Sequence, residues 1–186
     1  MAKNKTVTDV IKVAVILFVI TAVAAAILAY VNKVTAPVIA ENDKKAQEEA
    51  MRNVLPDGTI FGKMEFSGDE NTSVIEAYLS DAGYAVKVAP NGYGGPISMM
   101  VGVNENLEVT GIKIISQSET AGLGAKCTDS RFKAQFIGKT ENITVTKNGA
   151  KENEIDAISS ATITSKAVTK GVNDAIAIAK DAKGDK

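Results

Sequence analysis

The chain has 186 residues, of which 45% are hydrophobic and 23% are charged, and its 21 basic groups nearly balance its 22 acidic ones. It contains no His and a single Cys, which excludes a His general base, a Cys/His zinc site and a four-Cys iron–sulfur site built from its own residues. Four Lys lie within residues 1–33, so the remainder is net acidic and lacks the basic stripe that nucleic-acid binding requires.

An uncharged apolar segment lies near the N-terminus, over residues 13–32. A helix rises about 1.5 Å per residue, so this length spans roughly 30 Å, the thickness of the hydrocarbon core of a bilayer. The segment predicts a single transmembrane helix over residues 13–34, preceded by an N-tail of residues 1–12. One alternative is a buried helix of a soluble protein, but a helix this long and apolar would need a larger protein around it. The other is a cleaved signal peptide, with residues 24–26 near its cleavage site, but its apolar region is usually only about 7–15 residues long.

The charges beside the span favour one orientation. Three Lys and the α-amine precede the uncharged segment of residues 13–32, whereas Lys33, Lys44 and Lys45 follow it. The positive-inside rule then gives a mild preference for a cytoplasmic N-tail and an extracytoplasmic downstream domain. We therefore expect a single-pass protein of the cell (inner) membrane, in contact with lipid.

A second helix is expected directly after the span. Ala, Glu and Lys, which are good helix formers, dominate residues 41–54, and Pro37 and Pro56 flank this stretch. Proline disfavours the helical conformation of the residue before it, so Pro37 is expected to separate the span from a juxtamembrane helix within residues 35–55. A folded domain is then expected over residues 56–186.

Short apolar runs separated by turn formers follow. They predict strands over residues 74–79 and 84–89, and alternating apolar residues predict a third strand over 97–104. A turn at residues 104–106 leads into a strand through residue 114, in which Gly111 indicates a bulge. One more short strand is expected at residues 143–145.

Helical patterns complete the predicted domain. Two Phe residues four positions apart predict a short helix over residues 129–136, with Asp129 or Ser130 as its N-cap. Apolar residues at helical spacing predict a final helix over residues 167–179, capped by Thr164 or Ser165. The elements together predict an α+β domain behind one transmembrane helix.

Two stretches contain more Gly or hydroxyl groups than packing requires. Residues 117–126 follow a strand, and their two Gly would let the backbone approach a flat ligand closely, although an ordinary polar loop is the alternative.

Residues 156–164, Asp-Ala-Ile-Ser-Ser-Ala-Thr-Ile-Thr, place four hydroxyls before the final helix. A helix N-terminus favours phosphate through its free N–H groups and dipole; a Ser/Thr-rich N-cap is the alternative. A metal bridging Asp156 and phosphate during a chemical step would explain the carboxylate there.

These residues resemble a known family. The pattern Asp-x-x-Ser-x-Ala-Thr-x-Thr over residues 156–164 resembles the flavinylation motif of proteins that carry FMN covalently. Glu-Thr-Ala-Gly-Leu-Gly at residues 119–124 resembles the flavin-contact loop E-T-P-G-L-G of that family, and Gly-Tyr-Gly-Gly-Pro at residues 92–96 also matches. With its single span, the chain resembles the G subunits of Rnf complexes, which are ion-translocating ferredoxin:NAD oxidoreductases.

The resemblance implies a site and a function. A separate Mg-dependent flavin transferase would use FAD to esterify the FMN phosphate to Thr162. The chain would then be an extracytoplasmic electron-transfer subunit among other membrane subunits, without a catalytic residue set for substrate turnover and without a metal site. The implied cofactor-binding residues are Thr162, Asp156, Ser159, Ser160, Ala161, Thr164, Glu119, Thr120, Gly122, Leu123, Gly124 and Tyr93.

Individual roles and two departures follow from the same resemblance. Leu123 and Tyr93 are expected to pack near the flavin ring, and Glu119 with Thr120 to bond its polar groups or support the loop. Ser160 stands where the motif usually has Gly, and Ala121 where the loop usually has Pro. The Ser160 side chain is expected where the backbone passes close to phosphate, and Ala121 leaves the loop freer before flavin binds. The Thr162 hydroxyl and the Asp156 carboxylate remain.

Other functions stay open from the sequence. The C subunit of the sodium-pumping NADH:quinone oxidoreductase is usually longer, and a stand-alone anchored flavin domain would be more typical with a lipid-bearing Cys. A non-redox anchored binding or scaffold domain would leave Thr162 unmodified. No charged residue lies within residues 13–32, so ion translocation is expected to belong to partner subunits.

Overall fold

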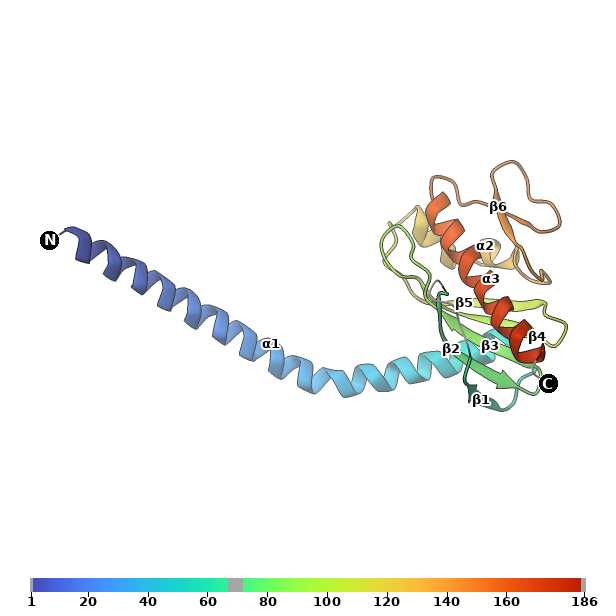
Figure 1. The fold of residues 1–186 in the computed structure, drawn as a ribbon, viewed down its shortest axis with the longest axis horizontal. Helices are drawn as coiled ribbons and strands as arrows, with labels where there is room; N and C mark the ends of the chain where they lie inside the picture. The colour runs from blue at the N-terminus through green and yellow to red at the C-terminus, as the bar shows by residue number, and fades with distance from the viewer. Residues whose placement is uncertain (1, 67–71, 185–186) are drawn as a thin grey trace. The chain divides into compact units, whose positions relative to one another are not determined.

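The computed structural model describes the backbone of residues 2–66 and 72–184, with side chains from residue 9 onward. The chain divides into two units, Met1–Lys45 and Ala46–Lys186. Helix α1 (Ala2–Val54) makes up the first unit and continues into the second (Figure 1). The expected boundary at Pro37 is wrong, because α1 runs through this proline without interruption. One proline costs about 3 kcal/mol in a helix interior, and the strong helix formers on its C-terminal side favour continuation.

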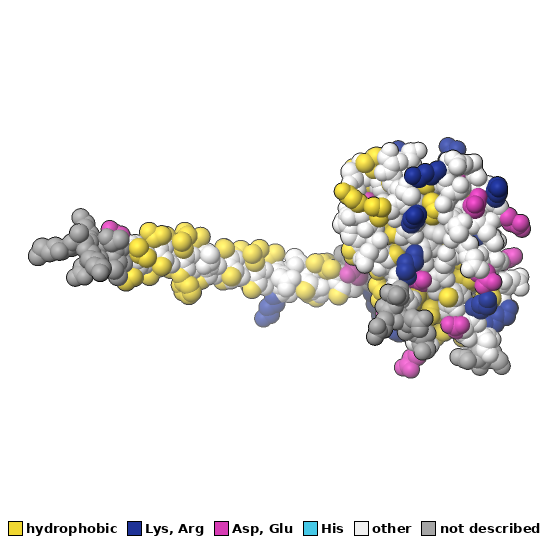
Figure 2. Space-filling view, turned by 45° about the horizontal axis from the view of Figure 1, so that its top comes forward, with side chains coloured by type: hydrophobic (Ala, Val, Ile, Leu, Met, Phe, Trp, Pro, Cys, Tyr) yellow, Lys and Arg dark blue, Asp and Glu magenta, His cyan; other side chains and the backbone are white. Residues whose placement is uncertain are grey.

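The first unit exposes apolar side chains all around its helix. Residues Asp9–Val54 form a helix that is long and apolar enough to cross a membrane by length and composition. Figure 2 shows the hydrophobic side chains along it, and among them Phe18 is 72% exposed. Such a surface fits the predicted single-pass membrane anchor.

The second unit is built on an antiparallel sheet whose strands follow chain order. These are β1 (Phe61–Met64), β2 (Val74–Ser80), β3 (Gly83–Val88), β4 (Ser98–Asn104) and β5 (Val109–Ser116). The strands predicted between residues 74 and 114 are therefore confirmed. The sequence does not predict β1, because its four residues, Phe-Gly-Lys-Met, are too few to show a period.

Helix α3 (Thr162–Gly184) covers one face of the sheet (Figure 1). Its buried Val168, Val172 and Ile176 pack in one cluster with Val86 of β3 and Met99 of β4. The predicted final helix is confirmed, but it begins at Thr162, before either predicted cap. This earlier start brings Thr162 and Thr164 into the first turn of the helix, while Ser159 and Ser160 precede it.

The end of α1 packs against the opposite set of sheet side chains. Met51, Val54 and Leu55 are buried with Ala85 of β3 and Met100 of β4. The bulge predicted near Gly111 is confirmed, since Gly102 pairs with Gly111 whereas the next residue of β4 pairs with Val109. The extra residue between those two partners is Thr110.

Smaller elements connect β5 to α3. A 3-10 helix (Gly124–Thr128) precedes α2 (Ser130–Ala134), and β6 (Thr144–Thr146) pairs in parallel with β7 (Glu154–Asp156). Phe132 and Phe136 meet edge to face with ring centroids 5.5 Å apart. Asp129 occupies the N-cap position of α2, but its side chain forms no capping hydrogen bond. These elements hold the loop after β5 close to the start of α3.

Candidate functional site

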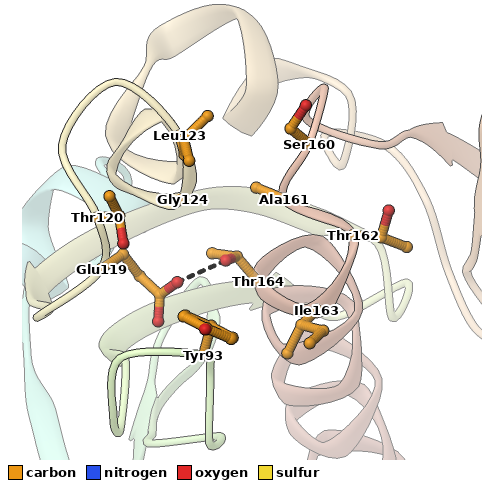
Figure 3. Close-up of a pocket in the computed structure, with 10 residues that line it drawn as sticks. All are labelled: Tyr93, Glu119, Thr120, Leu123, Gly124, Ser160, Ala161, Thr162, Ile163 and Thr164. Atoms are coloured by element: carbon orange, nitrogen blue, oxygen red, sulfur yellow. Dashed lines mark hydrogen bonds between the residues drawn. The ribbon is translucent and has the colours of Figure 1, made fainter.

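The stretches singled out in the sequence meet around one cavity of about 560 Å³ (Figure 3). One wall comes from the loop before β4, another from the loop after β5, and the third from the first turn of α3. This volume lies within the range of small-molecule sites. The lining residues are Tyr93, Glu119, Thr120, Leu123, Gly124, Ser160, Ala161, Thr162, Ile163 and Thr164.

Most of the residues implied by the resemblance line this cavity, but three do not. Asp156, Ser159 and Gly122 are all exposed and lie outside the lining. Gly122 has a φ of 77°, in the left-handed region, and an added Cβ would have no atom within 4 Å. The backbone conformation of the turn, and not a lack of space, therefore favours glycine there. Asp156 lies at the end of β7, where its backbone N–H donates to Gln135 Oε1 at 2.7 Å.

Glu119 is the polar centre of the cavity wall. The residue is only 8% exposed, and both of its carboxylate oxygens accept hydrogen bonds. Oε1 accepts from the backbone N–H of Gly94 at 2.9 Å, and Oε2 accepts from the Thr164 hydroxyl at 2.5 Å. Figure 3 shows the second of these bonds reaching the start of α3.

The hydroxyl groups at the start of α3 have different roles. The Thr164 hydroxyl is buried and donates to Glu119, and Ser165 Oγ accepts from the Ile158 N–H and donates to the Ala161 carbonyl. The predicted capping role of Thr164 or Ser165 is therefore wrong, because both lie inside the helix. Thr162 is partly exposed, and its hydroxyl has no hydrogen-bond partner among the residues that the structure describes.

The first turn of α3 also presents free backbone N–H groups. The earliest helical hydrogen bond runs from the Ser165 N–H to the Ala161 carbonyl at 3.0 Å. Within the described part of the chain, the N–H groups of residues 162–164 have no acceptor. Together with the helix dipole they form a site that attracts an anion, beside the Thr162 hydroxyl.

Ser160 adopts a backbone conformation that favours glycine. Its φ is 61°, in the left-handed region, and its side chain is exposed at the edge of the cavity. A non-glycine residue there costs roughly 1–2 kcal/mol. The motif that these residues resemble usually has Gly at this position, and the left-handed backbone is a physical reason for such a preference.

The rim of the cavity is apolar. Tyr93 is 74% exposed, Leu123 is 42% exposed and Ile163 is 55% exposed, which is unusual for three large apolar side chains around one opening. Such side chains can cover the faces of a flat aromatic ligand. The sequence prediction does not include Ile163, because it stands at an unspecified position of the motif pattern, between Thr162 and Thr164.

Cys127 belongs to the 3-10 helix that begins at Gly124 of the cavity lining, and it is fully buried. Burial raises the pKa of its thiol, and the charge of Glu119 raises it further. Both observations fit a small buried hydrophobic side chain and not a reactive thiol.

Sequence comparison finds two matching family models. An FMN-binding domain matches residues 92–177, a range that includes every residue of the cavity lining, and an RnfG N-terminal region matches residues 1–54. The chain is 39% identical to the G subunit of the Na(+)-translocating ferredoxin:NAD(+) oxidoreductase complex of Acetobacterium woodii, over 91% of both chains. It is 33% identical to the proton-translocating counterpart from Clostridium ljungdahlii, over 95% of both.

Structure comparison finds a similar fold in a solved structure. The crystal structure of the C subunit of Na(+)-translocating NADH-quinone reductase from Parabacteroides distasonis aligns with a TM-score of 0.52 and 19% sequence identity. The alignment covers 73% of this chain and 91% of that chain. This likeness confirms the α+β fold class and says nothing further about activity.

Proposed function

We propose that this chain, which belongs to the family of G subunits of ion-translocating ferredoxin:NAD(+) oxidoreductase complexes, carries FMN in the cavity at the start of α3 and relays electrons within such a complex. The match to an FMN-binding domain supports the cofactor, and the two sequence relatives support the assembly. The observation that carries the proposal is the unpartnered Thr162 hydroxyl, which lies beside free N–H groups and an apolar rim within the described residues.

The two ends of the cavity fit the two ends of FMN. The N–H groups of residues 162–164 would hold the phosphate, and the Ser160 hydroxyl lies on the same side of the lining. Tyr93, Leu123 and Ile163 would cover the ring and exclude water from it. FMN, when bound, supplies the reversible electron transfer that the side chains of this chain do not provide.

Covalent attachment at Thr162 is part of the proposal. Thr164 is buried and donates to Glu119, whereas the Thr162 hydroxyl is accessible and adjoins the free N–H groups. The Thr162 oxygen would form an ester bond with the FMN phosphorus while the pyrophosphate bond of FAD breaks. AMP would leave and the hydroxyl proton would be released, with the reaction catalysed by a separate flavin transferase. Asp156 is exposed where the transferase and its metal could reach it.

The membrane arrangement follows from the sequence. We propose a cytoplasmic N-tail over residues 1–12, a span over residues 13–34, a helical connection through residue 55 and an extracytoplasmic FMN domain over residues 56–186. The partners are the other membrane subunits of the complex, the flavin transferase and membrane lipid. Turnover of ferredoxin and NAD would need those subunits, because this chain contributes a carrier and not a complete active site.

Two alternatives weighed from the sequence are less well supported. The C subunit of the sodium-pumping NADH:quinone oxidoreductase shares the fold at 19% identity, but relatives at 33–39% identity are G subunits. A scaffold domain without flavin would not explain the match to an FMN-binding domain over the cavity.

Intact mass spectrometry of the full-length protein, produced with a flavin transferase, tests the proposal. Esterified FMN adds roughly 440 Da to the chain, a value that follows from the chemistry of the cofactor. We expect Thr162→Ala to abolish the adduct and Ser160→Ala, a matched loss of a neighbouring hydroxyl, to retain it. An adduct that persists in Thr162→Ala would contradict the attachment site, and a wild-type chain without any flavin would contradict the function.

A further inference from the structure

We propose that Glu119 is a positioning residue: its buried carboxylate holds the three walls of the cavity together and does not itself contact the cofactor. The inference rests on the proposed function, because it concerns how the FMN cavity is formed. It selects one of the two roles that the sequence left open for Glu119, a support for the loop and not a ligand of the flavin.

The hydrogen bonds of Glu119 connect all three walls. Glu119 belongs to the loop after β5, Gly94 belongs to the loop before β4, and Thr164 belongs to α3. One carboxylate oxygen accepts from the Gly94 N–H at 2.9 Å and the other accepts from the Thr164 hydroxyl at 2.5 Å. Its own N–H donates to Gln117 Oε1, which fixes the backbone of the loop locally. A single side chain therefore joins segments that are far apart in the sequence.

Glycines close tightly around the same carboxylate. A Cβ atom at position 92 would lie 2.3 Å from Oε1, and a Cβ atom at position 124 would lie 2.4 Å from Oε2. No side chain other than hydrogen fits at Gly92 or Gly124 without moving Glu119. Each oxygen is thus flanked by a backbone segment in addition to its donor, which leaves little room for a polar group of a ligand.

The contacts of Glu119 set the positions of the apolar rim. Tyr93 lies between Gly92 and Gly94, Leu123 directly precedes Gly124, and Ile163 directly precedes Thr164. Each rim residue is therefore a sequence neighbour of a residue that contacts the carboxylate. In Figure 3 these side chains surround the opening, while the Glu119 carboxylate is directed to Thr164. If the carboxylate is lost, all three rim residues lose their common anchor.

Replacing Glu119 by Gln removes the charge of the side chain but keeps its capacity for hydrogen bonding. In Glu119→Gln the amide oxygen can still accept from the Gly94 N–H, and the amide nitrogen can donate to Thr164 Oγ1, because a hydroxyl both donates and accepts. Glu119→Ala removes both bonds. Thr164→Val removes one donor, and Thr164→Ser restores it. Asp129→Ala is the matched control, since Asp129 is an exposed carboxylate without a capping bond.

The experiment compares these full-length variants with and without FMN loading by the transferase. In the unloaded protein, we expect Glu119→Ala to speed amide hydrogen exchange at residues 92–95 by about tenfold, with Glu119→Gln and the control within about twofold of wild type. In the loaded protein, we expect Glu119→Ala and Thr164→Val to lower FMN occupancy and alter the visible circular dichroism of the flavin. Glu119→Gln and Thr164→Ser should restore both signals.

Two results would overturn the inference. The first is that Glu119→Gln exchanges its amide hydrogens like wild type but has the same flavin spectrum as Glu119→Ala. The carboxylate would then act on the cofactor directly. The other is Glu119→Ala with wild-type exchange, occupancy and spectrum. Failure of the proposed function is distinct: a wild-type chain without FMN contradicts that function, whereas the exchange comparison on the unloaded chain still decides whether Glu119 holds the walls.

Discussion

The Thr110 hydroxyl donates a 2.5 Å hydrogen bond to the carbonyl of Val54, the last residue of α1. Thr110 is the extra residue of the bulge in β5, so the irregularity in the strand supplies the acceptor at the helix end with a donor. Gly102 of β4 lies close to the same carbonyl oxygen, because a Cβ atom at position 102 would be 2.3 Å from it. The bulge and the glycine together allow the C-terminal end of α1 to pack closely against the sheet.

We predict that Gly102→Ala destabilises the second unit. The added methyl group must displace the Val54 carbonyl, and overpacking of this kind costs about 2 kcal/mol. For a domain of this size the midpoint of thermal unfolding should fall by roughly 5–10 °C. Circular dichroism of the protein in detergent, recorded during heating, measures this midpoint. Gly62→Ala in β1 is the control, since its Cβ would have its nearest neighbour at 4.0 Å. Equal midpoints for the two variants would contradict the prediction.

We predict that Ser160→Gly stabilises the chain. Gly removes the steric cost of a φ of 61°, which outweighs the greater backbone entropy of Gly in the unfolded state and leaves a net gain of about 0.5–1 kcal/mol. Chemical denaturation of the unloaded protein measures the free energy of unfolding. Ser159→Gly is the matched control, because Ser159 is also exposed but does not have a positive φ. If both variants destabilise equally, the left-handed strain is not relieved by Gly.

The polar contacts of Glu76 on β2 predict loss of stability in acid. A hydrogen bond from Lys63 lowers the pKa of Glu76 below its ordinary 4.5, opposed by partial burial and helped by Gln47 and Tyr78. A lowered carboxyl pKa stabilises the fold at pH above the unfolded value, and the contribution is lost as the pH falls through the folded one. The melting temperature should therefore decline below pH 4.5.

Glu76→Gln removes that contribution, so the variant should melt lower than wild type at pH 7 and lose less on acidification. Glu105→Gln is the control, because the Glu105 side chain is exposed and forms no ion pair within the described ranges. If the melting temperatures of wild type and Glu76→Gln fall by the same amount on acidification, other carboxylates dominate the loss of stability in acid.

Local patterns predict the elements whose residues interact mainly with their immediate neighbours. Strands β2 and β3 follow from short apolar runs, β4 follows from alternation, and α3 follows from helical spacing. The bulge in β5 follows from Gly111. The predicted break at Pro37 is wrong because proline lowers helix stability without forbidding the helix, and the residues after it favour its continuation.

The errors at the site have a common cause in long-range contacts. Local spacing predicts Thr164 as a helix cap, but its hydroxyl is engaged by Glu119, which lies 45 positions earlier. The sequence also predicts Gly124 as a place for close approach of a ligand, whereas its missing Cβ makes room for the carboxylate of Glu119. The motifs identify which segments meet, and only the folded arrangement distinguishes a residue facing the cavity from one that supports its wall.

The last prediction concerns Asp156, which the motif includes but the cavity lining does not. Its side chain is exposed and its backbone supplies the bond to Gln135, so Asp156→Asn should leave the unfolding midpoint unchanged. If Asp156 positions the metal of the transferase, the variant should slow FMN incorporation by at least about tenfold, the lower end of the effect of losing a group that orients a metal site. Time-resolved intact mass measures incorporation, with Glu152→Gln as the exposed-carboxylate control. Incorporation at the wild-type rate would show that Asp156 has no part in maturation, whereas a slower rate with an unchanged midpoint separates a role in the transfer reaction from a role in the fold.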